Sequence, residues 1–292
     1  MGDGEAGDRH GDANGDLHRD PRGDPPQEPR GEAPWVLILG ASSGFGEAAS
    51  LALARAGMNV FGVHLDRKAT LANVERVQSG IRDAGADAVF FNVNAADPER
   101  RAEVVATMHE RMADGAGTLR VLMHSLAFGA LRPLVPTGGE RALTDREIAM
   151  TLDVMANSLV YWVQDVLARD LMRAGGRIFA MTSAGDQHAW PSYGAVSAAK
   201  CALEAYCRQL ALELAPRGIS VNALRAGVTD TPALRRIPGA EVMLEASRRR
   251  NPSGRLTRPE DVAGAIVALS DAGAGWITGN VIGVDGGEEV AT

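Results

Sequence analysis

The chain has 292 residues, of which 45% are hydrophobic and 23% charged, and its formal net charge at pH 7 is -7. This composition is typical of a soluble globular protein that buries a full hydrophobic core. No apolar run approaches the roughly 20 residues that cross a bilayer, and the first residues lack the positive and apolar segments of a secretion signal, so we expect a cytoplasmic protein without a membrane partner.

The opening segment, residues 1–33, is rich in Gly, Asp and Pro and nearly free of large apolar side chains. It holds nine acidic residues and four arginines, a net charge of -5, so the rest of the chain is close to neutral. Such a segment buries too little apolar surface to offset the entropy lost on ordering. We therefore predict a disordered tail at 1–33 and one folded domain at 34–292.

After the tail, short apolar runs alternate with longer segments of helical periodicity. The apolar runs predict strands at 35–40, 59–65, 87–93, 120–129, 176–185, 219–227 and 279–287. Apolar residues at helical spacing predict helices at 47–57, 71–85, 98–115, 153–172, 197–215 and 260–270. This alternation requires right-handed crossovers and a parallel sheet covered on both faces, so the predicted fold class is α/β with a single doubly wound domain.

Three glycines, Gly40, Gly44 and Gly46, lie between the first predicted strand and the first predicted helix. In a Rossmann domain this turn binds a dinucleotide pyrophosphate, because the helix N–H groups and the positive end of the helix dipole face it. Tight turns also use glycine for structural reasons alone, but the strand–turn–helix context favours a nucleotide site. The cofactor contacts expected here are Gly40, Ser42, Ser43, Gly44, Phe45 and Gly46.

Tyr193 precedes Lys200 by seven residues, at the start of the predicted helix 197–215. Seven residues are about two helical turns, so both side chains could face one side. A lysine held near a phenol would lower the tyrosine pKa from about 10, which makes the hydroxyl a usable proton donor or oxyanion partner near neutral pH. The structural alternative is a tyrosine that packs over a helix start beside a solvated lysine.

From about Trp35 to its C-terminus the chain resembles the short-chain dehydrogenase/reductase family. The resemblance rests on GASSGFG, Asn92-Val93, VSAAKCALEAYCRQLALELAPRGISVNAL, AGVTDTPAL and GNVIGVDGG. Within that family, HSLAFG at 124–129, the Tyr193-x6-Lys200 spacing and Ala-Gly at 226–227 are similar to the enoyl-acyl carrier protein reductases. LRPLV, TDTPALRRIPG and NPSGR are similar to the NADPH-dependent branch of those enzymes.

The resemblance implies that a nicotinamide hydride is delivered to the β-carbon of a 2-enoyl thioester. Tyr193 would stabilise the enolate on the carbonyl oxygen, and Lys200 would hold the nicotinamide ribose. Val196 stands where carbonyl-reducing relatives have their tyrosine, and Met155 stands where most have a proton-relay asparagine, so both disfavour keto-group reduction. Ser183 matches the serine that polarises the carbonyl in keto reductases, but the NADPH-dependent enoyl branch has it too, and it could also simply end a strand.

The predicted second strand runs into the charged segment 64–68, His-Leu-Asp-Arg-Lys. Arg67 could bind a 2'-phosphate and favours NADPH, whereas Asp66 keeps NADH possible, and the charge run could equally be a solvated loop. The resemblance assigns further cofactor contacts to Asn92 and Val93 at the adenine, Ser125, Leu126 and Ala127 at the nicotinamide, and Gly227, Thr229 and Thr231 at the carboxamide and phosphates.

The segment from Arg225 to Arg258 holds eight arginines and three acids, a net charge of +5. The resemblance implies a mobile substrate lid here, and an acidic acyl carrier protein would be steered to it. A solvated helix face is the alternative, and no interleaved aromatics accompany the arginines to indicate nucleic acid. The helices at 150–173 and 200–215 carry broad apolar faces, and the resemblance implies that such faces join chains into a homotetramer or homodimer, although burial by a neighbouring helix would give the same pattern. The two cysteines and the histidines lack metal-ligand spacing, so no metal is expected.

Three functions follow from these patterns. The first is an NADPH-dependent enoyl-thioester reductase of fatty-acid or polyketide synthesis, acting on acyl carrier protein or coenzyme A thioesters. The second is a 3-oxoacyl or other carbonyl reductase of the same family. The third is a nucleotide-binding protein without catalysis. The sequence leaves the acyl chain length and the carrier open.

Overall fold

The computed structural model describes Met1 and residues 33–113, 117–136 and 138–291. The chain divides into two units, Met1–Arg30 and Gly31–Thr292, and every element below belongs to the second. Apart from its two ends, the predicted disordered tail lies outside the described residues.

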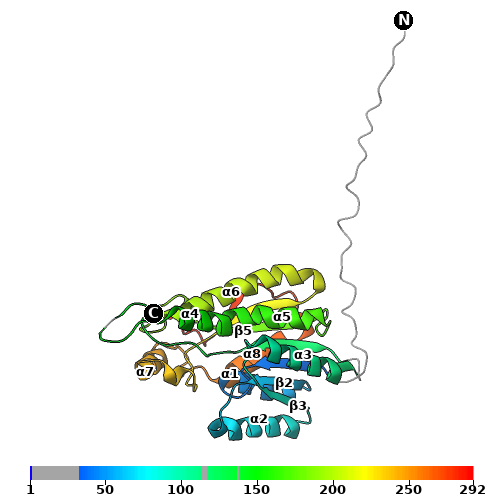
Figure 1. Ribbon diagram of the computed structural model, residues 1–292, viewed down its shortest axis with the longest axis horizontal. Coiled ribbons are helices and arrows are strands. Elements are labelled where there is room, and N and C mark those ends of the chain that lie inside the picture. The colour runs from blue at the N-terminus through cyan, green and yellow to red at the C-terminus, as the bar shows by residue number, and fades with distance from the viewer. Residues whose placement is uncertain (2–32, 114–116, 137, 292) are drawn as a thin grey trace. The chain divides into compact units, whose positions relative to one another are not determined.

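The centre of the domain is a seven-stranded sheet in which every pair of neighbours is parallel (Figure 1). Its order is β3-β2-β1-β4-β5-β6-β7. The strands are β1 Trp35–Leu39, β2 Asn59–His64, β3 Ala88–Asn92, β4 Leu119–His124, β5 Arg177–Ser183, β6 Ser220–Ala226 and β7 Val281–Val284. The order reverses between β1 and β4, and open α/β sheets bind ligands at the carboxyl edge of that reversal. The predicted doubly wound parallel sheet is confirmed.

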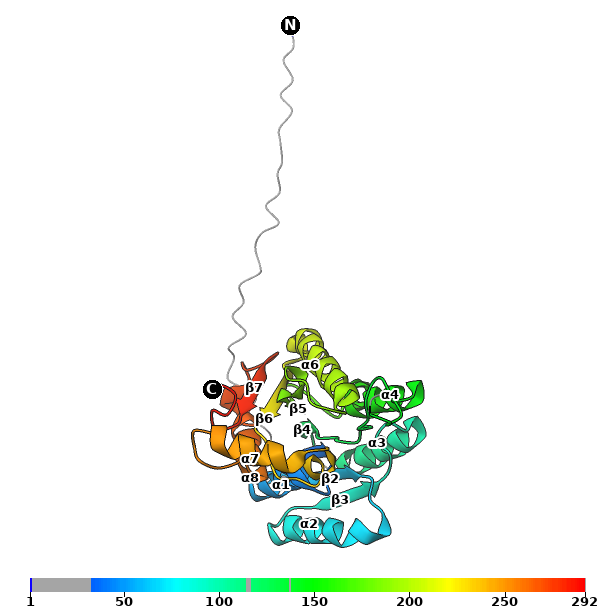
Figure 2. The same ribbon diagram turned by 90° about the vertical axis from the view of Figure 1, so that its left-hand side faces the viewer.

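Helices cover both faces of the sheet (Figure 2). They are α1 Gly44–Arg55, α2 Leu71–Asp83, α3 Pro98–Ala113, α4 Asp145–Leu152, α5 Ser158–Ala168, α6 Gly194–Leu214, α7 Ala240–Arg250 and α8 Pro259–Leu269. Apolar residues of α3, α5 and α6 pack on one face, and those of α1, α2 and α8 pack on the other. Along β1, Leu37 and Leu39 belong to the first cluster while Val36 and Ile38 belong to the second, which explains a strand without polar alternation.

The structure differs from the predicted elements in four places. The helix predicted at 153–172 is interrupted, because Asp153–Asn157 form a π-helix before α5 begins. The strand predicted at 120–129 ends at His124, since the next N–H donates to the end of β1 and the chain then leaves the sheet. Helices α4 and α7 were not predicted. No helix among the described residues is long and apolar enough to cross a membrane.

Candidate active site

The glycine turn between β1 and α1 is built to receive an anion. Ser43 is the N-cap of α1, yet no side chain caps the helix, so the first-turn N–H groups keep their capacity for a ligand. A Cβ on Gly40, whose φ is +93°, would overlap the carbonyl of Ser125, and a Cβ on Gly46 would overlap the carbonyl of Gly40. Both positions therefore require glycine, and the backbone lies close to any bound group.

A cavity of about 230 Å³ follows this turn along the carboxyl edge of the sheet, at the reversal between β1 and β4. Its wall includes most of the predicted cofactor contacts: Gly40, Ser42, Ser43, Gly44, Phe45, Val93, Ser125, Leu126, Ala127 and Thr231. Gly227 and Thr229 line the adjoining larger cavity instead. The uncapped helix start, the glycine contacts and this elongated space fit a dinucleotide.

Three predicted cofactor residues, Gly46, Arg67 and Asn92, line neither cavity. Asn92 supports the loop after β2 instead, because its side chain accepts from the Asp66 N–H at 2.9 Å and donates to the Asp66 carbonyl at 3.0 Å. Arg67 is exposed on the same loop. Sequence reasoning did not identify His64, which is buried at the end of β2 and lines the smaller cavity.

His64 and Asp66 form a pair where β2 meets this cavity, with 3.0 Å between His64 Nδ1 and Asp66 Oδ2. Burial lowers the His64 pKa, although the hydrogen bond and the charge of Asp66 oppose this. Burial acts to raise the pKa of Asp66, but hydrogen bonds with Ser42, Thr70 and His64 outweigh it and lower that pKa. The carboxylate is thus already engaged within the protein.

The larger cavity, about 560 Å³, brings Tyr193, Lys200 and Ser183 together. Ser183 ends β5, Tyr193 immediately precedes α6, and Lys200 lies two turns into that helix. The Tyr193 hydroxyl is 3.4 Å from Ser183 Oγ. The Lys200 ammonium donates to the carbonyl of Met181 on β5 at 2.7 Å. The structure therefore brings the predicted catalytic set to one cavity wall.

The expected lowering of the Tyr193 pKa by Lys200 is wrong for this structure. Burial raises the pKa of Tyr193, the hydrogen bond with Ser183 acts against it, and Lys200 is not among the causes. Burial also lowers the pKa of Lys200 to about 8, although Cys207 and Glu204 act to raise it. The physical reason is that the protein removes both groups from water while the ammonium is bound to a backbone carbonyl. Tyr193 is therefore a protonated phenol at neutral pH.

Glu204 is a functional candidate that sequence reasoning missed. It lies one turn beyond Lys200 on α6, is only 8% exposed, and accepts a hydrogen bond of 2.7 Å from Thr182 Oγ1. Its charge acts to raise the Lys200 pKa. A glutamate four residues after the lysine, on the same helix face, was the signal available in the sequence.

Val196 and Met155 form an apolar part of the cavity wall. Both are buried, Val196 in α6 and Met155 in the π-helix. A Cβ on Gly129 would lie 2.7 Å from Val196 Cγ2 and 2.9 Å from Met155 Sδ, so the loop after β4 rests on these two side chains. Neither residue can donate or accept a proton, as the sequence predicted.

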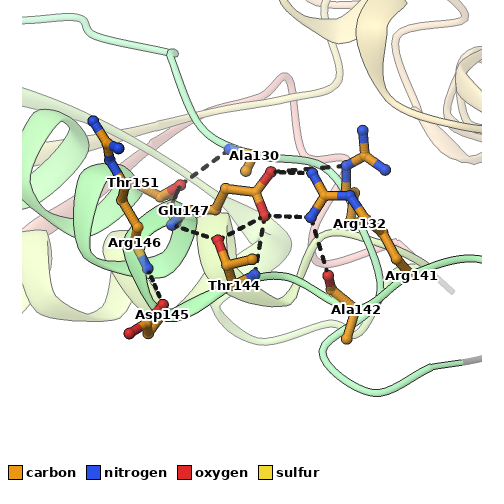
Figure 3. Close-up of polar contacts among 9 residues, drawn as sticks. All are labelled: Ala130, Arg132, Arg141, Ala142, Thr144, Asp145, Arg146, Glu147 and Thr151. Carbon is orange, nitrogen blue, oxygen red and sulfur yellow. Dashed lines mark hydrogen bonds and ion pairs between the residues drawn. The ribbon is translucent and has the colours of Figure 1, made fainter.

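The loop between β4 and α4 is fixed at its far end by a polar cluster (Figure 3). Thr144 and Glu147 form a capping box at the start of α4. Arg141 donates two hydrogen bonds to Glu147, at 2.7 and 2.9 Å, and these bonds contribute most to lowering the Glu147 pKa to about 2. The Ala130 N–H donates to Thr151 Oγ1 at 3.0 Å. This anchoring holds the part of the loop that lines the larger cavity.

Residues of 231–250, which lie within the segment 225–258 where the resemblance implied a lid, line the same cavity. The Trp190 indole donates to the Pro238 carbonyl at 2.8 Å, and a Cβ on Gly239 would lie 3.2 Å from the Trp190 ring. The end of α7 is joined to the C-terminal segment, because Arg250 and Glu288 form an ion pair at 3.1 Å. These contacts hold the segment against the loop at Trp190 and against the C-terminal segment.

Local ion pairs engage several arginines of the segment 225–258. Arg235 lies 2.6 Å from Asp230 and 3.6 Å from Glu241, and Arg248 and Arg249 pair with Glu245 at 3.6 and 3.3 Å. These three acids are already counted in the net charge of +5. Only Asp261 and Glu288, which pair with Arg255 and Arg250 from outside the segment, lower that charge further, by two, so the segment stays basic.

His124, at the end of β4, is wholly buried beside the site. Its Nε2 lies 2.9 Å from Ser158 Oγ, whose hydroxyl donates to the carbonyl of Val154. Burial, together with the charge of Lys200, lowers the His124 pKa to about 3, so the imidazole is neutral. Within the part of the chain that the structure describes, no three His, Cys, Asp or Glu side chains could share a metal ion.

Comparison with known proteins gives consistent matches. A family model described as enoyl-(acyl carrier protein) reductase matches residues 40–289. The chain is 34% identical to 1-cyclohexenylcarbonyl-CoA reductase of Streptomyces collinus over 86% of this chain and 85% of the relative. It is 30% identical to an enoyl-[acyl-carrier-protein] reductase [NADH] of Aquifex aeolicus over 64% of this chain and 68% of the relative. A short-chain dehydrogenase structure from Burkholderia cenocepacia, in complex with NADP, superposes with a TM-score of 0.74 at 25% identity, covering 88% of this chain and 98% of that one.

Proposed function

Because this chain belongs to the short-chain dehydrogenase/reductase family, close to its enoyl reductases, and is thus an NAD(P)-dependent oxidoreductase, we propose that it reduces the carbon–carbon double bond of a 2-enoyl thioester. The observation that carries this proposal is the cavity wall around Tyr193. Its hydroxyl faces the same cavity as Ser183, while an apolar Val196 fills the position of the carbonyl-reductase tyrosine.

In the proposed reaction, the carbon that accepts the hydride and the oxygen that becomes negatively charged are different atoms of the substrate. When bound, the nicotinamide supplies a hydride to the β-carbon of the substrate. Negative charge then develops on the thioester carbonyl oxygen, two carbons away, where a hydroxyl donor is needed. Uptake of a proton from solvent at the α-carbon converts this enolate to the saturated thioester and completes the reduction. Tyr193 meets this need as a neutral phenol, because burial raises its pKa and keeps its proton in place. Ser183, 3.4 Å away, orients the phenol.

Lys200 and the apolar wall complete the proposed chemistry. Bound to the Met181 carbonyl at 2.7 Å, the Lys200 ammonium is held at the floor of the cavity, where it can donate to the ribose hydroxyls of the cofactor. Val196 and Met155 exclude water from the neighbouring wall, which strengthens the hydrogen bond of Tyr193 to the developing oxyanion. The Lys200 ammonium and the apolar wall therefore support an enolate with its negative charge on the carbonyl oxygen, and neither requires a proton relay.

We propose NADPH as the preferred reductant. Asp66 is engaged by His64 at 3.0 Å, so its carboxylate is not poised to select the ribose hydroxyls of NADH. Arg67 follows it on the exposed side of the loop, and within the described residues it forms no ion pair. A guanidinium in this position is suited to a 2'-phosphate.

The group that carries the acyl chain and the number of chains in the assembly are also proposals. A coenzyme A thioester is the substrate named for the Streptomyces relative, and a carrier-protein thioester is named for the Aquifex one. The coenzyme A relative is the more similar of the two, at 34% identity over 86% of this chain against 30% over 64%, so we favour coenzyme A. Association of two or four chains through the apolar faces of α5 and α6, and cytoplasmic residence, remain predictions.

A specific observation favours one alternative, the reduction of a carbonyl group. The contact between Ser183 and Tyr193 is an arrangement that can also polarise a ketone. In that case hydride and proton would reach adjacent atoms, and a donor at Val196 would be expected. Because Val196 cannot donate a proton, we prefer enoyl reduction to carbonyl reduction as the proposed function.

The test is a comparison of crotonyl-CoA and acetoacetyl-CoA, each with NADPH and NADH, followed by nicotinamide absorbance. We expect oxidation of NADPH with crotonyl-CoA and little with acetoacetyl-CoA. Tyr193→Phe should lower kcat by about a hundredfold or more, as removal of one oxyanion donor does, without weakening NADPH binding. Faster turnover of acetoacetyl-CoA would establish the carbonyl alternative, and a wild-type rate in Tyr193→Phe would indicate nucleotide binding without this chemistry.

A further inference from the structure

Arg225 is a cation of the larger cavity for which the described part of the chain supplies no ion-pair partner. It is the penultimate residue of β6, half-buried, and lines that cavity. Its Nε is buried and makes no hydrogen bond, and within the described residues its guanidinium forms no ion pair. A partly desolvated charge without a partner is costly, so its presence in a cavity indicates a ligand group that compensates it.

The position of Arg225 places it beside the proposed catalytic residues. It stands opposite Thr182 in the register of β5 and β6, and the next pair joins Ala226 to Ser183. Neighbouring strands lie about 4.8 Å apart, and residues in register point to the same face of a sheet. That face is covered by α6, because Ala223, two residues back along β6 and therefore on the same face, packs in the cluster with that helix. The guanidinium therefore enters the cavity one strand away from Ser183.

The acidic side chains of the same cavity are already bound elsewhere. Asp285 accepts two backbone N–H groups, at 3.0 and 3.1 Å. Glu288 accepts one backbone N–H at 3.1 Å and pairs with Arg250 at 3.1 Å. Glu289 lies 3.9 Å from His188. These carboxylates give structure to the C-terminal segment and leave the cation on β6 without a counter-charge in contact.

The missing anion belongs to the substrate rather than to the cofactor. The cofactor phosphates are expected at the uncapped start of α1, in the smaller cavity, and Arg236 lines that cavity whereas Arg225 does not. Much of the remaining wall around Arg225 is apolar, for example Met243 and Ile237 from the lid, as an acyl group requires. A guanidinium recognises a carboxylate through two parallel hydrogen bonds.

We propose that Arg225 binds a carboxylate carried by the acyl group of the substrate, so that the enzyme prefers thioesters of dicarboxylic acids. This inference rests on the proposed reduction of a 2-enoyl thioester and specifies its substrate class. The salt bridge forms on binding, offsets the cost of the unpaired guanidinium and fixes the acyl chain relative to Tyr193.

The test compares 2-hexenoyl-CoA with 2-hexenedioyl-CoA, which has the same chain length and a terminal carboxylate. We expect kcat/KM to favour the dicarboxylic substrate by about tenfold or more, the usual strength of a hydrogen bond between charged groups. Arg225→Met should lower kcat/KM for this substrate by about ten- to a hundredfold, with little change for hexenoyl-CoA, and Arg225→Lys should retain part of the preference. Arg249→Met is the matched control, because Arg249 is exposed on α7 and does not line the cavity.

Binding of saturated thioesters separates this inference from the proposed reaction. Adipoyl-CoA and hexanoyl-CoA would be titrated calorimetrically into the wild type and Arg225→Met, in the presence of NADP+, with four- and eight-carbon pairs added so that chain length cannot hide the effect. Tighter binding of the dicarboxylic member that depends on Arg225 supports the inference even if no enoyl thioester is reduced. Equal binding of both members at every length overturns it, and so does an equal loss for both substrates in Arg225→Met, whatever the outcome for enoyl reduction.

Discussion

Lys200 is the residue at which stability and function conflict most clearly. Its ammonium is 5% exposed and has one hydrogen bond, to the carbonyl of Met181. Burial lowers its pKa from 10.5 to about 8, so the fold favours the neutral amine over the ammonium that would bind the cofactor ribose. The unfolded chain keeps the proton up to about pH 10.4. The charge therefore costs stability below pH 8, and that cost disappears as the pH rises from 8 to 10.5.

The variant Lys200→Met should therefore be inactive and yet more stable than the wild type at pH 7. The expected gain in the free energy of unfolding is roughly 1–3 kcal/mol, which is the desolvation cost less the lost hydrogen bond. The gain should shrink toward pH 10.5, because the wild type sheds the proton in that range. Urea unfolding at pH 7, 9 and 10 measures it, with the exposed Lys68→Met as control. A less stable variant at pH 7 would mean that the ammonium contributes a net favourable interaction.

The residues of the site divide into those that sequence reasoning could identify and those that it could not. Tyr193 and Lys200 lie within one local segment, so their spacing alone brings them to one side of a helix. His64 and Glu204 had local signals, a carboxylate two residues on and a lysine four residues before, but their burial shows only in the folded chain. The bond of Glu204 to Thr182 of β5 joins two elements, and Arg225 is notable because no ion-pair partner for it exists among the described residues. Burial and pairing between elements are tertiary properties that no local pattern records.

At the scale of elements, α4 shows what a closer reading of local signals could have found. Thr144 and Glu147 are spaced as a capping box, Thr-x-x-Glu, which marks a helix start in the sequence itself. The interruption of the next helix by the π-helix Asp153–Asn157 has no comparable signal. That irregular turn follows from contacts with α6 and with the loop over the cavity, so only the folded chain determines it.

The cluster around Glu147 is expected to control the loop between β4 and α4. Glu147→Ala removes both the return bond of the capping box and the two hydrogen bonds from Arg141, so the loop should open more often and the KM for the thioester should rise. Glu147→Gln keeps the capping interaction and loses the charge, so its effect should be smaller. Since the folded carboxylate has a pKa of about 2, its contribution should persist down to about pH 4.5 and fade below it.

Hydrogen exchange provides the readout for this loop. Faster exchange of the amides of residues 130–144 in Glu147→Ala than in Glu147→Gln, with unchanged exchange in β5, is the expected pattern. Exchange that is faster by the same factor across the whole domain would mean that the substitution lowers global stability instead. Unaltered exchange in both variants would show that the loop is held by its apolar contacts with α6 and the π-helix.

At the scale of the whole molecule, the alternation of strands and helices was sufficient to predict the sheet. A strand order with one reversal follows from right-handed crossovers, and the two apolar clusters on either face follow from strands without polar alternation. What the alternation could not predict is how the segments beyond the strand ends close over the cavity. The covering by 125–143 and 231–250 depends on single contacts, such as that of Trp190 with Pro238.

The cofactor cavity joins segments that are far apart in the chain, from Gly40 on the first turn to Arg236 on the lid, so cofactor binding should stabilise the domain as one unit. At a concentration one hundred times its dissociation constant, a ligand adds about 2.7 kcal/mol to the free energy of unfolding. For a domain of this size, that raises Tm by roughly 5–10 °C.

We expect this shift in Tm with NADPH and a smaller shift with NADH at equal concentration. Arg67→Ala should abolish the difference by weakening NADPH alone, while Arg55→Ala, exposed at the far end of α1, should leave it intact. Thermal unfolding with each nucleotide measures both effects. A larger shift with NADH would mean that Asp66 gives up its bond to His64 and selects the unphosphorylated ribose.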